Sequence, residues 1–234
     1  MKFKILTLFP EIFPGPLGKS IIGKALNEKK FSLETFNIRD FSTLKNKRVD
    51  EKPFGGGAGM VLRSDIMQRC LDYSLNDSKY KKRKIINFSP RGEKLDQNIL
   101  KKFLEYDEIV LICGRYEGID QRFLDFNIIE EVSVGDYVLS CGDIAAFILI
   151  DSCVRLIPEV LGNKDSLFNE SFHSNLLEYP HYTKPRNWNK LEVPSILLSG
   201  NHNKIQEWRK AKAKEITKKA RPDLWKLYKK KKEF

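Results

Sequence analysis

The stretch that most constrains the fold is residues 109–142, in which glycines follow directly after two apolar runs. The apolar runs are Ile109–Ile112 and Ile128–Val134, and the glycines are Gly114, Gly118, Gly135 and Gly142. An apolar run that ends in small residues is typical of a buried strand followed by a loop whose backbone approaches a ligand. Two such loops close together in sequence predict a pocket in which main-chain groups hold one small ligand.

The first 160 residues alternate apolar runs of strand length with helical patterns. Strands are predicted over residues 3–8, 31–38, 84–88, 107–113 and 128–134, and helices over 17–27, 64–75, 96–104, 120–126 and 143–156. This alternation predicts an α/β fold, with a parallel sheet covered by helices on both faces. Ligands bind beyond the carboxyl ends of such strands, so the loops 89–92, 114–118 and 133–142 should meet at that edge.

Two common nucleotide-binding motifs are excluded. No Lys-Ser/Thr pair follows the triple glycine at 55–57, so that loop is not a P-loop, and no GxGxxG follows the first strand. The triple glycine indicates either a flexible linker or a loop that a large ligand approaches closely. The four cysteines show no CxxC spacing and there are three histidines, so we expect buried thiols rather than a zinc site or disulfides.

Positive charge is concentrated at the C-terminus. The chain carries a formal net charge of +11, and residues 201–234 hold 13 Lys/Arg against 4 Asp/Glu. A helix is predicted over 204–220, with Ile205, Trp208, Ala211 and Ile216 facing inward, and Trp225 and Tyr228 lie among the last lysines. Aromatic side chains between lysines favour a surface that binds nucleic-acid phosphates, and the alternative is a tail that only improves solubility.

No apolar run reaches the length of about 18 residues that a membrane helix requires. The apolar start of the chain carries Glu11 and is interrupted by Pro10 and Pro14, so it predicts a first strand rather than a signal peptide. The expected location is therefore the cytoplasm.

Five ordered motifs together resemble a known family. They are Phe54-Gly55-Gly56-Gly57-Ala58-Gly59-Met60, Cys113-Gly114-Arg115-Tyr116-Glu117-Gly118-Ile119-Asp120, Ser133-Val134-Gly135-Asp136-Tyr137-Val138-Leu139-Ser140, Tyr179-Pro180-His181-Tyr182-Thr183-Lys184-Pro185 and Leu198-Ser199-Gly200-Asn201-His202. They span nearly the whole chain and resemble the bacterial tRNA (guanine-N1)-methyltransferases of the SPOUT class.

The resemblance implies a knotted enzyme of two domains. A deep trefoil knot, rare among folds, would lie on the C-terminal side of a cofactor-binding domain over residues 1–161. A linker (162–174) and a basic, mostly helical tRNA-binding domain (175–234) would follow. The enzyme would be a homodimer whose subunits share the active site. It would transfer a methyl group from S-adenosylmethionine to N1 of the guanosine 3′ of the anticodon (position 37) in tRNA, and a need for Mg²⁺ is left open.

The resemblance also assigns the site. Cofactor contacts would come from Ser89, Pro90, Gly114, Tyr116, Glu117, Gly118, Ser133, Val134, Gly135, Asp136, Tyr137, Val138, Leu139 and Gly142. Guanine N1 carries a proton, so a carboxylate would act as general base and an arginine would stabilise negative charge on O6. By register these residues are Glu170, where the family carries aspartate, and Arg155.

Two alternatives stay open. Asp165, in Asp165-Ser166-Leu167, is a second candidate for the base, five residues before Glu170. Cys141 stands where the family has glycine, which puts the geometry of that loop in question. Because of Cys141 and Glu170, the competing hypothesis is a non-catalytic RNA-binding protein that retains the knot and the basic tail.

Overall fold

The structure, a computed structural model, describes residues 1–76, 80–162, 170–172 and 174–230. The chain divides into two compact units, Met1–Gly162 and Asn163–Phe234. The division falls at the start of the segment for which the sequence predicts an interdomain linker.

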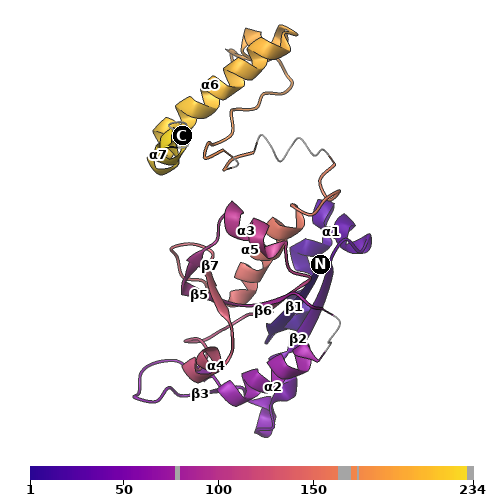
Figure 1. The fold of residues 1–234 in the computed structure, drawn as a ribbon, viewed down its shortest axis with the longest axis vertical. Helices are drawn as coiled ribbons and strands as arrows, with labels where there is room; N and C mark the ends of the chain where they lie inside the picture. The colour runs from indigo at the N-terminus through magenta and orange to yellow at the C-terminus, as the bar shows by residue number, and fades with distance from the viewer. Residues whose placement is uncertain (77–79, 163–169, 173, 231–234) are drawn as a thin grey trace. The chain divides into compact units, whose positions relative to one another are not determined.

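The first unit is built on a five-stranded parallel sheet in the order β2-β1-β6-β5-β7 (Figure 1). The strands are β1 (Lys2–Thr7), β2 (Ser32–Asn37), β5 (Arg83–Lys94), β6 (Glu108–Ile112) and β7 (Glu130–Ser133). The prediction of a parallel α/β sheet is thus confirmed. Two further short strands, β3 (Asp50–Glu51) and β4 (Val61–Leu62), pair antiparallel with each other and were not predicted.

Helices cover both faces of the sheet. One core cluster combines the sheet with α1 (Ser20–Asn27), α3 (Gln97–Phe103) and α5 (Gly142–Val154). The other combines it with α2 (Ser64–Leu75) and α4 (Gln121–Phe126). Successive residues of β6 alternate between the two clusters, with Ile109 and Leu111 in the first and Val110 and Ile112 in the second. A strand buried on both faces reads as one continuous apolar run, which is why the sequence predicted β6.

A buried ion-pair network lies at the amino end of the central strands. The Nζ of Lys4 lies 3.1 Å from a carboxylate oxygen of Glu108 and donates a hydrogen bond of 2.5 Å to the carbonyl of Ser74. Arg83 also pairs with Glu108, at 2.5 Å, from the neighbouring strand. Because Glu108 is fully buried, losing a partner would leave an uncompensated charge in the core, so the network favours this strand arrangement.

The largest differences from the predicted boundaries occur at two places. The strand expected to end at Phe88 continues as β5 to Lys94, with an irregularity in which Phe88 and Glu93 both align with Val132 of β7. The intervening residues bulge away from the sheet at its carboxyl edge. The helix expected from residue 17 begins at Ser20, because Gly15–Gly18 form a short 3-10 helix.

The described part of the second unit contains two α-helices, a short 3-10 helix (Ser195–Leu198) and a hairpin. The α-helices are α6 (His202–Ala220) and α7 (Pro222–Lys230), and β8 (Asn187–Trp188) pairs with β9 (Leu191–Glu192). Within α6 the residues that become buried are Ala213 and Thr217, whereas Ala211, predicted to face inward, is exposed. The inward stripe follows a spacing of four residues through Arg209, Ala213 and Thr217, and Ala211 lies on the opposite side.

Helix α7 was not predicted from the sequence. Its lysine-rich composition concealed one apolar stripe, formed by Leu224 and the stacked rings of Trp225 and Tyr228. In the part of the chain that the structure describes, no helix combines the length and the apolar character needed to cross a bilayer.

Candidate active site

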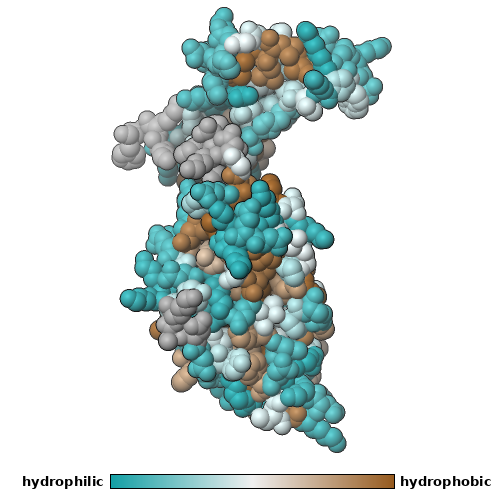
Figure 2. All heavy atoms as spheres, turned by 90° about the vertical axis from the view of Figure 1, so that its right-hand side faces the viewer, coloured by the Kyte–Doolittle hydropathy of each residue, from teal (hydrophilic) through white to brown (hydrophobic). Residues whose placement is uncertain are grey.

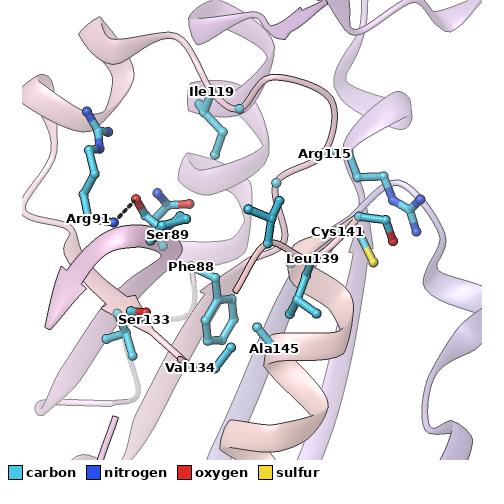
Figure 3. A pocket seen from close by; sticks show the side chains of 18 of the residues that line it. Phe88, Ser89, Arg91, Arg115, Ile119, Ser133, Val134, Leu139, Cys141 and Ala145 are labelled. Atoms are coloured by element: carbon cyan, nitrogen blue, oxygen red, sulfur yellow. Dashed lines mark hydrogen bonds between the residues drawn. The ribbon is translucent and has the colours of Figure 1, made fainter. Parts of the chain in front are cut away.

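Three loops at the carboxyl edge of the sheet enclose one pocket of about 540 Å³. It is lined by residues of segments 87–91, 114–121 and 132–142, with Leu124 and Ala145 completing it. In Figure 3, Phe88, Val134, Leu139 and Ala145 lie together, with Arg91 on one side of them and Arg115 on the other. The pocket therefore has an apolar centre and a charged group at each side.

The structure brings together nearly all the residues that the resemblance assigns to the cofactor. Of that set, every member except Asp136 lines the pocket. The Asp136 side chain is 86% exposed and pairs with Lys94 at 2.9 Å, so it points to solvent. The loops predicted to meet at one edge of the sheet do meet.

At two glycines of the pocket, a Cβ atom would collide with neighbouring atoms. A Cβ on Gly142 would lie 2.8 Å from the Cα of Cys113 and 2.9 Å from the nitrogen of Gly114. At Gly135 (φ +152°) a Cβ would lie 2.3 Å from the ring of Tyr137. The Gly142 amide also donates a hydrogen bond of 2.8 Å to the Gly114 carbonyl. The loop before α5 thus lies directly against the end of β6.

The 114–118 loop is fastened to the segment after the triple glycine. The Leu62 amide donates to the carbonyl of Gly118 at 2.9 Å, and the Asp120 amide donates back to the Leu62 carbonyl at 3.0 Å. The Glu117 amide donates to Met60 at 2.9 Å. Short strand β4 therefore holds this side of the pocket, a role that the sequence did not indicate.

A buried carboxylate, that of Asp143, accepts hydrogen bonds from a residue that lines the pocket and from the end of β1. Asp143, in the first turn of α5, has no exposed surface and accepts hydrogen bonds from Arg115 at 2.9 and 3.2 Å and from Thr7 at 2.5 Å. The Arg115 guanidinium also lies 4.2 Å from the centre of the Phe9 ring. Burial, and then the nearby Asp143 carboxylate, hold the pKa of the Cys113 thiol well above its usual value. The sequence analysis missed this network, whose only signal was an arginine between two loop glycines.

Arg91 is the second charged residue that the sequence analysis missed. Its guanidinium donates to Gln121 of α4 at 3.2 Å and to Glu131 of β7 at 3.2 Å, and its amide donates to the Ser89 hydroxyl at 3.2 Å. It therefore joins the 89–92 bulge to two other walls of the pocket. Its position beside the predicted residues Ser89 and Pro90 was the available signal.

Cys141 fits its position without glycine geometry. Its φ of −163° and ψ of 157° are extended backbone, which any residue adopts, and it is the N-cap residue of α5. The side chain is half-buried and lines the pocket. The other cysteines, Cys70, Cys113 and Cys153, are buried free thiols, as the sequence predicted.

The two residues assigned to catalysis lie in different units. Arg155 is the C-cap residue of α5, where its amide donates to the Asp151 carbonyl at 3.2 Å. Glu170 lies in the second unit, in a turn, and lines a pocket of about 420 Å³ together with Tyr179, Arg209 and Ala213. Asp165, the alternative base, lies outside the described residues.

The turn that carries Glu170 is tied to the second unit. The Glu178 amide donates to the Ser171 hydroxyl at 3.0 Å, and the Leu177 amide donates to the Thr217 hydroxyl of α6 at 2.8 Å. The Arg209 guanidinium lies 4.8 Å from the centre of the Tyr179 ring, and its buried Nε has no hydrogen-bond partner among the described residues. Glu170 is therefore placed beside aromatic and cationic groups of α6 and the segment before it.

In the segments that the structure describes, no three His, Cys, Asp or Glu side chains gather as metal ligands would.

Comparison with known proteins gives a consistent match over the whole chain. The sequence profile of the family described as tRNA (Guanine-1)-methyltransferase TrmD matches residues 1–227. A tRNA (guanine-N(1)-)-methyltransferase of Neorickettsia sennetsu is 53% identical over 96% of this chain and 98% of its own length. A protein of the same name from Pelagibacter ubique is 48% identical over 97% of this chain and 98% of its own length. Another from Rhodospirillum rubrum is 49% identical over 96% of this chain and 92% of its own length. Together with the pocket formed by the family's ordered motifs, these matches show that the chain belongs to the tRNA (guanine-1)-methyltransferase family.

Proposed function

We propose that the protein transfers a methyl group from S-adenosylmethionine to N1 of the guanosine at position 37 of tRNA. Membership of the family, over nearly the full length of chains that share about half of their residues with this one, carries the proposal. The pocket between the 89–92, 114–121 and 132–142 loops would hold the cofactor.

The residues of the pocket fit such a cofactor. Its volume of about 540 Å³ falls within the range of roughly 300–1,000 Å³ that is usual for small-molecule sites. The apolar centre of Phe88, Val134, Leu139 and Ala145 suits a flat adenine ring, and main-chain groups of the glycine loops can hydrogen-bond its polar edge. When bound, S-adenosylmethionine supplies an electrophilic methyl group on a sulfonium. That these loops cross as a trefoil knot is part of the same proposal.

Glu170 would prepare the acceptor base. Neutral guanine N1 has its lone pair delocalised into the ring and carries a proton, so it is a poor nucleophile until that proton leaves. A carboxylate within hydrogen-bond reach accepts the proton, and the N1 electron pair then forms the bond to the methyl carbon. Glutamate has the same acid chemistry as the family's aspartate and is one methylene longer. Arg155 would donate hydrogen bonds to O6, where negative charge builds up as N1 loses its proton.

The second unit would bind the tRNA. Its surface combines lysines of α6 and α7 with the aromatic side chains Trp225 and Tyr228, and Lys229 lies 5.8 Å from the centre of the Trp225 ring. Phosphate contacts from lysine supply affinity without sequence preference, so the identity of the methylated base would be read elsewhere. The reaction would take place in the cytoplasm.

A homodimer is part of the proposal. Helix α5 is apolar over most of its surface, and its Ile144 and Ile148 are exposed, as is Ile21 of the neighbouring α1. A mostly apolar helix is normally buried, so a second copy of the chain is the natural cover for these exposed side chains. On the face of the first unit that Figure 2 presents, hydrophobic residues are exposed among hydrophilic ones. Sedimentation equilibrium tests this point, and a monomer at micromolar concentration would contradict it.

The deciding assay uses the purified protein, S-adenosylmethionine with a labelled methyl group, and matched tRNA transcripts. One transcript carries guanosine at position 37 and the other adenosine. We expect label in the first only, located at N1 by nucleoside analysis. The competing hypothesis, a non-catalytic RNA-binding protein, predicts binding of both transcripts without label in either.

A further inference from the structure

We propose that Arg91 binds the carboxylate of the amino-acid part of the cofactor. The inference rests on the proposed function, since it concerns S-adenosylmethionine in the pocket described above. It assigns a protein side chain to the carboxylate of the cofactor, a group for which the glycine-loop residues supply no positive charge. Recognition of this end matters because the adenosyl part alone is shared with many other cellular nucleosides.

Two positively charged side chains line the pocket, and one of them already pairs with a buried carboxylate. Among its lining residues, only Arg91 and Arg115 carry positive charge. Arg115 uses its Nε and one Nη on Asp143, at 3.2 and 2.9 Å, and its guanidinium lies against the ring of Phe9. Turning Arg115 toward a ligand would leave the fully buried Asp143 without its counter-charge, which is costly.

Arg91 lies at the rim of the pocket, and not all of its N–H donors are used by the described residues. Both Nη atoms donate to Gln121 and one of them also to Glu131, whereas its Nε has no acceptor within the described part of the chain. The side chain is 63% exposed, so water can be exchanged for a ligand carboxylate at little cost. Glu131 also accepts from Asn87, at 3.4 Å, and so keeps a partner if Arg91 shifts toward the ligand. A guanidinium braced in this way is preorganised for a charge-assisted hydrogen bond.

The rival anion site on this rim is the N-terminus of α5. Cys141 and Gly142 line the pocket there, and helix N-termini attract negative charge. The first turn of α5 already contains the Asp143 carboxylate, however, and the Gly142 amide is bonded to Gly114. In Figure 3, Arg91 and Cys141 lie on opposite sides of the apolar centre, so the two sites would place the ligand in opposite directions.

The test compares two ligands that differ in one group. S-adenosylmethionine and its decarboxylated form share the adenosyl group, the sulfonium and the amine, and only the first has the carboxylate. Calorimetric titration of the wild-type protein should show tighter binding of the carboxylate-bearing ligand, by about tenfold for a partly exposed charge-assisted contact. In Arg91→Gln this preference should fall to about one, and Arg91→Lys should restore part of it.

The control is Arg122→Gln, which removes an exposed arginine of α4 that pairs with Asp120 and does not line the pocket. This variant should keep the wild-type preference. Equal weakening of both ligands by Arg91→Gln would show that Arg91 only braces the loops, and unchanged affinities would show that it has no role; either result overturns the inference. If the wild-type protein binds neither ligand, the proposed function itself fails.

Discussion

Glu170 is the residue whose assignment matters most for the chemistry. It lies in a turn of the second unit, next to Tyr179 and Arg209, and its role is a proposal that depends on register with the family. Glutamate carries one more methylene than aspartate between the backbone and the carboxylate, and it remains a competent base. The hydrogen bonds from Glu178 to Ser171 and from Leu177 to Thr217 hold the turn within the second unit, so we expect the side chain rather than the turn to accommodate the added length.

Replacing Glu170 by Gln should lower kcat by a factor of about 10² to 10⁴, because the amide cannot accept the N1 proton. Affinity for S-adenosylhomocysteine should stay within about twofold, because the cofactor pocket belongs to the first unit. Single-turnover methyl transfer and calorimetry measure the two quantities. Asp165→Asn is the matched control and should be nearly as active as the wild-type protein. The reverse pattern would assign the base to Asp165.

The cysteines should differ in reactivity. Burial raises the pKa of the Cys70 and Cys153 thiols to about 12, and burial together with Asp143 raises the pKa of the Cys113 thiol. At pH 8 these thiols stay protonated and enclosed, whereas half-exposed Cys141 can react. A disulfide reagent should therefore label one thiol in the folded protein and four after denaturation. Labelling of two or more thiols without unfolding would contradict this.

The raised pKa values of the three buried thiols also determine the direction in which stability changes with pH. Above about pH 8.5, thiols of the unfolded chain lose their protons while the three buried thiols retain theirs. The unfolded state then binds fewer protons, so the free energy of unfolding should fall as the pH rises from about 8.5.

At the scale of elements, the contact between the loop before α5 and the end of β6 shapes the pocket. Gly142 is the first residue of α5, and its amide bonds to Gly114 directly after β6. The Arg115–Asp143 pair joins the same two elements a few residues away. Two independent contacts thus hold the 114–121 and 132–142 loops in register, and both depend on the backbones lying very close together.

Gly142→Ala should therefore be destabilising. The added methyl group would meet backbone atoms of Cys113 and Gly114 at 2.8–3.1 Å, and backbone cannot move aside as a flexible side chain can. We expect a loss of about 1–3 kcal/mol in the free energy of unfolding and weaker binding of S-adenosylhomocysteine. Urea denaturation and calorimetry measure these effects.

Gly162→Ala is the matched control, because a Cβ there meets no described atom within 4 Å. It should change the free energy of unfolding by less than about 0.5 kcal/mol. Equal stability of the two variants would show that the loop before α5 can move away from β6.

At the scale of the whole molecule, the lysine-rich surface and the pocket belong to different units. The pocket between the 89–92, 114–121 and 132–142 loops belongs to the first unit, and residues 101–150, which contain much of it, hold 4 Lys/Arg against 10 Asp/Glu. The lysine-rich surface belongs to the second unit, on α6 and α7. An anionic RNA would therefore be gripped mainly by the second unit, while the first presents a pocket suited to a cofactor with a positively charged sulfonium.

Removing residues 225–234 should weaken tRNA binding by about tenfold or more at physiological salt and reduce the salt dependence of the binding constant. The truncation removes five lysines together with Trp225 and Tyr228. Filter binding over a range of salt concentrations measures both effects.

A second variant separates charge from folding. Changing the same five lysines to Gln keeps Trp225 and Tyr228 and should reduce the salt slope by a similar amount. An unchanged slope in both variants would show that the tail serves only solubility.

Much of this protein was determined by local sequence. The central strand β6 was predictable because it is an apolar run buried on both faces, edge strand β2 because apolar and polar residues alternate along it, and the glycine loops marked the pocket edge. Helix α7 and the buried positions Ala213 and Thr217 of α6 were not predicted, because lysine-rich helices hide a short apolar stripe and the register of that stripe depends on what it packs against.

Only the tertiary structure decided the electrostatics of the site. Arg115 pairs with Asp143 and Arg91 with Glu131, 28 and 40 residues apart in sequence. Such pairs carry no periodic signal in the chain and arise only when the sheet brings the loop ends together. The sequence alone therefore located the pocket, whereas the packing decided that Arg115 pairs with a fully buried carboxylate and Arg91 with a partly exposed one.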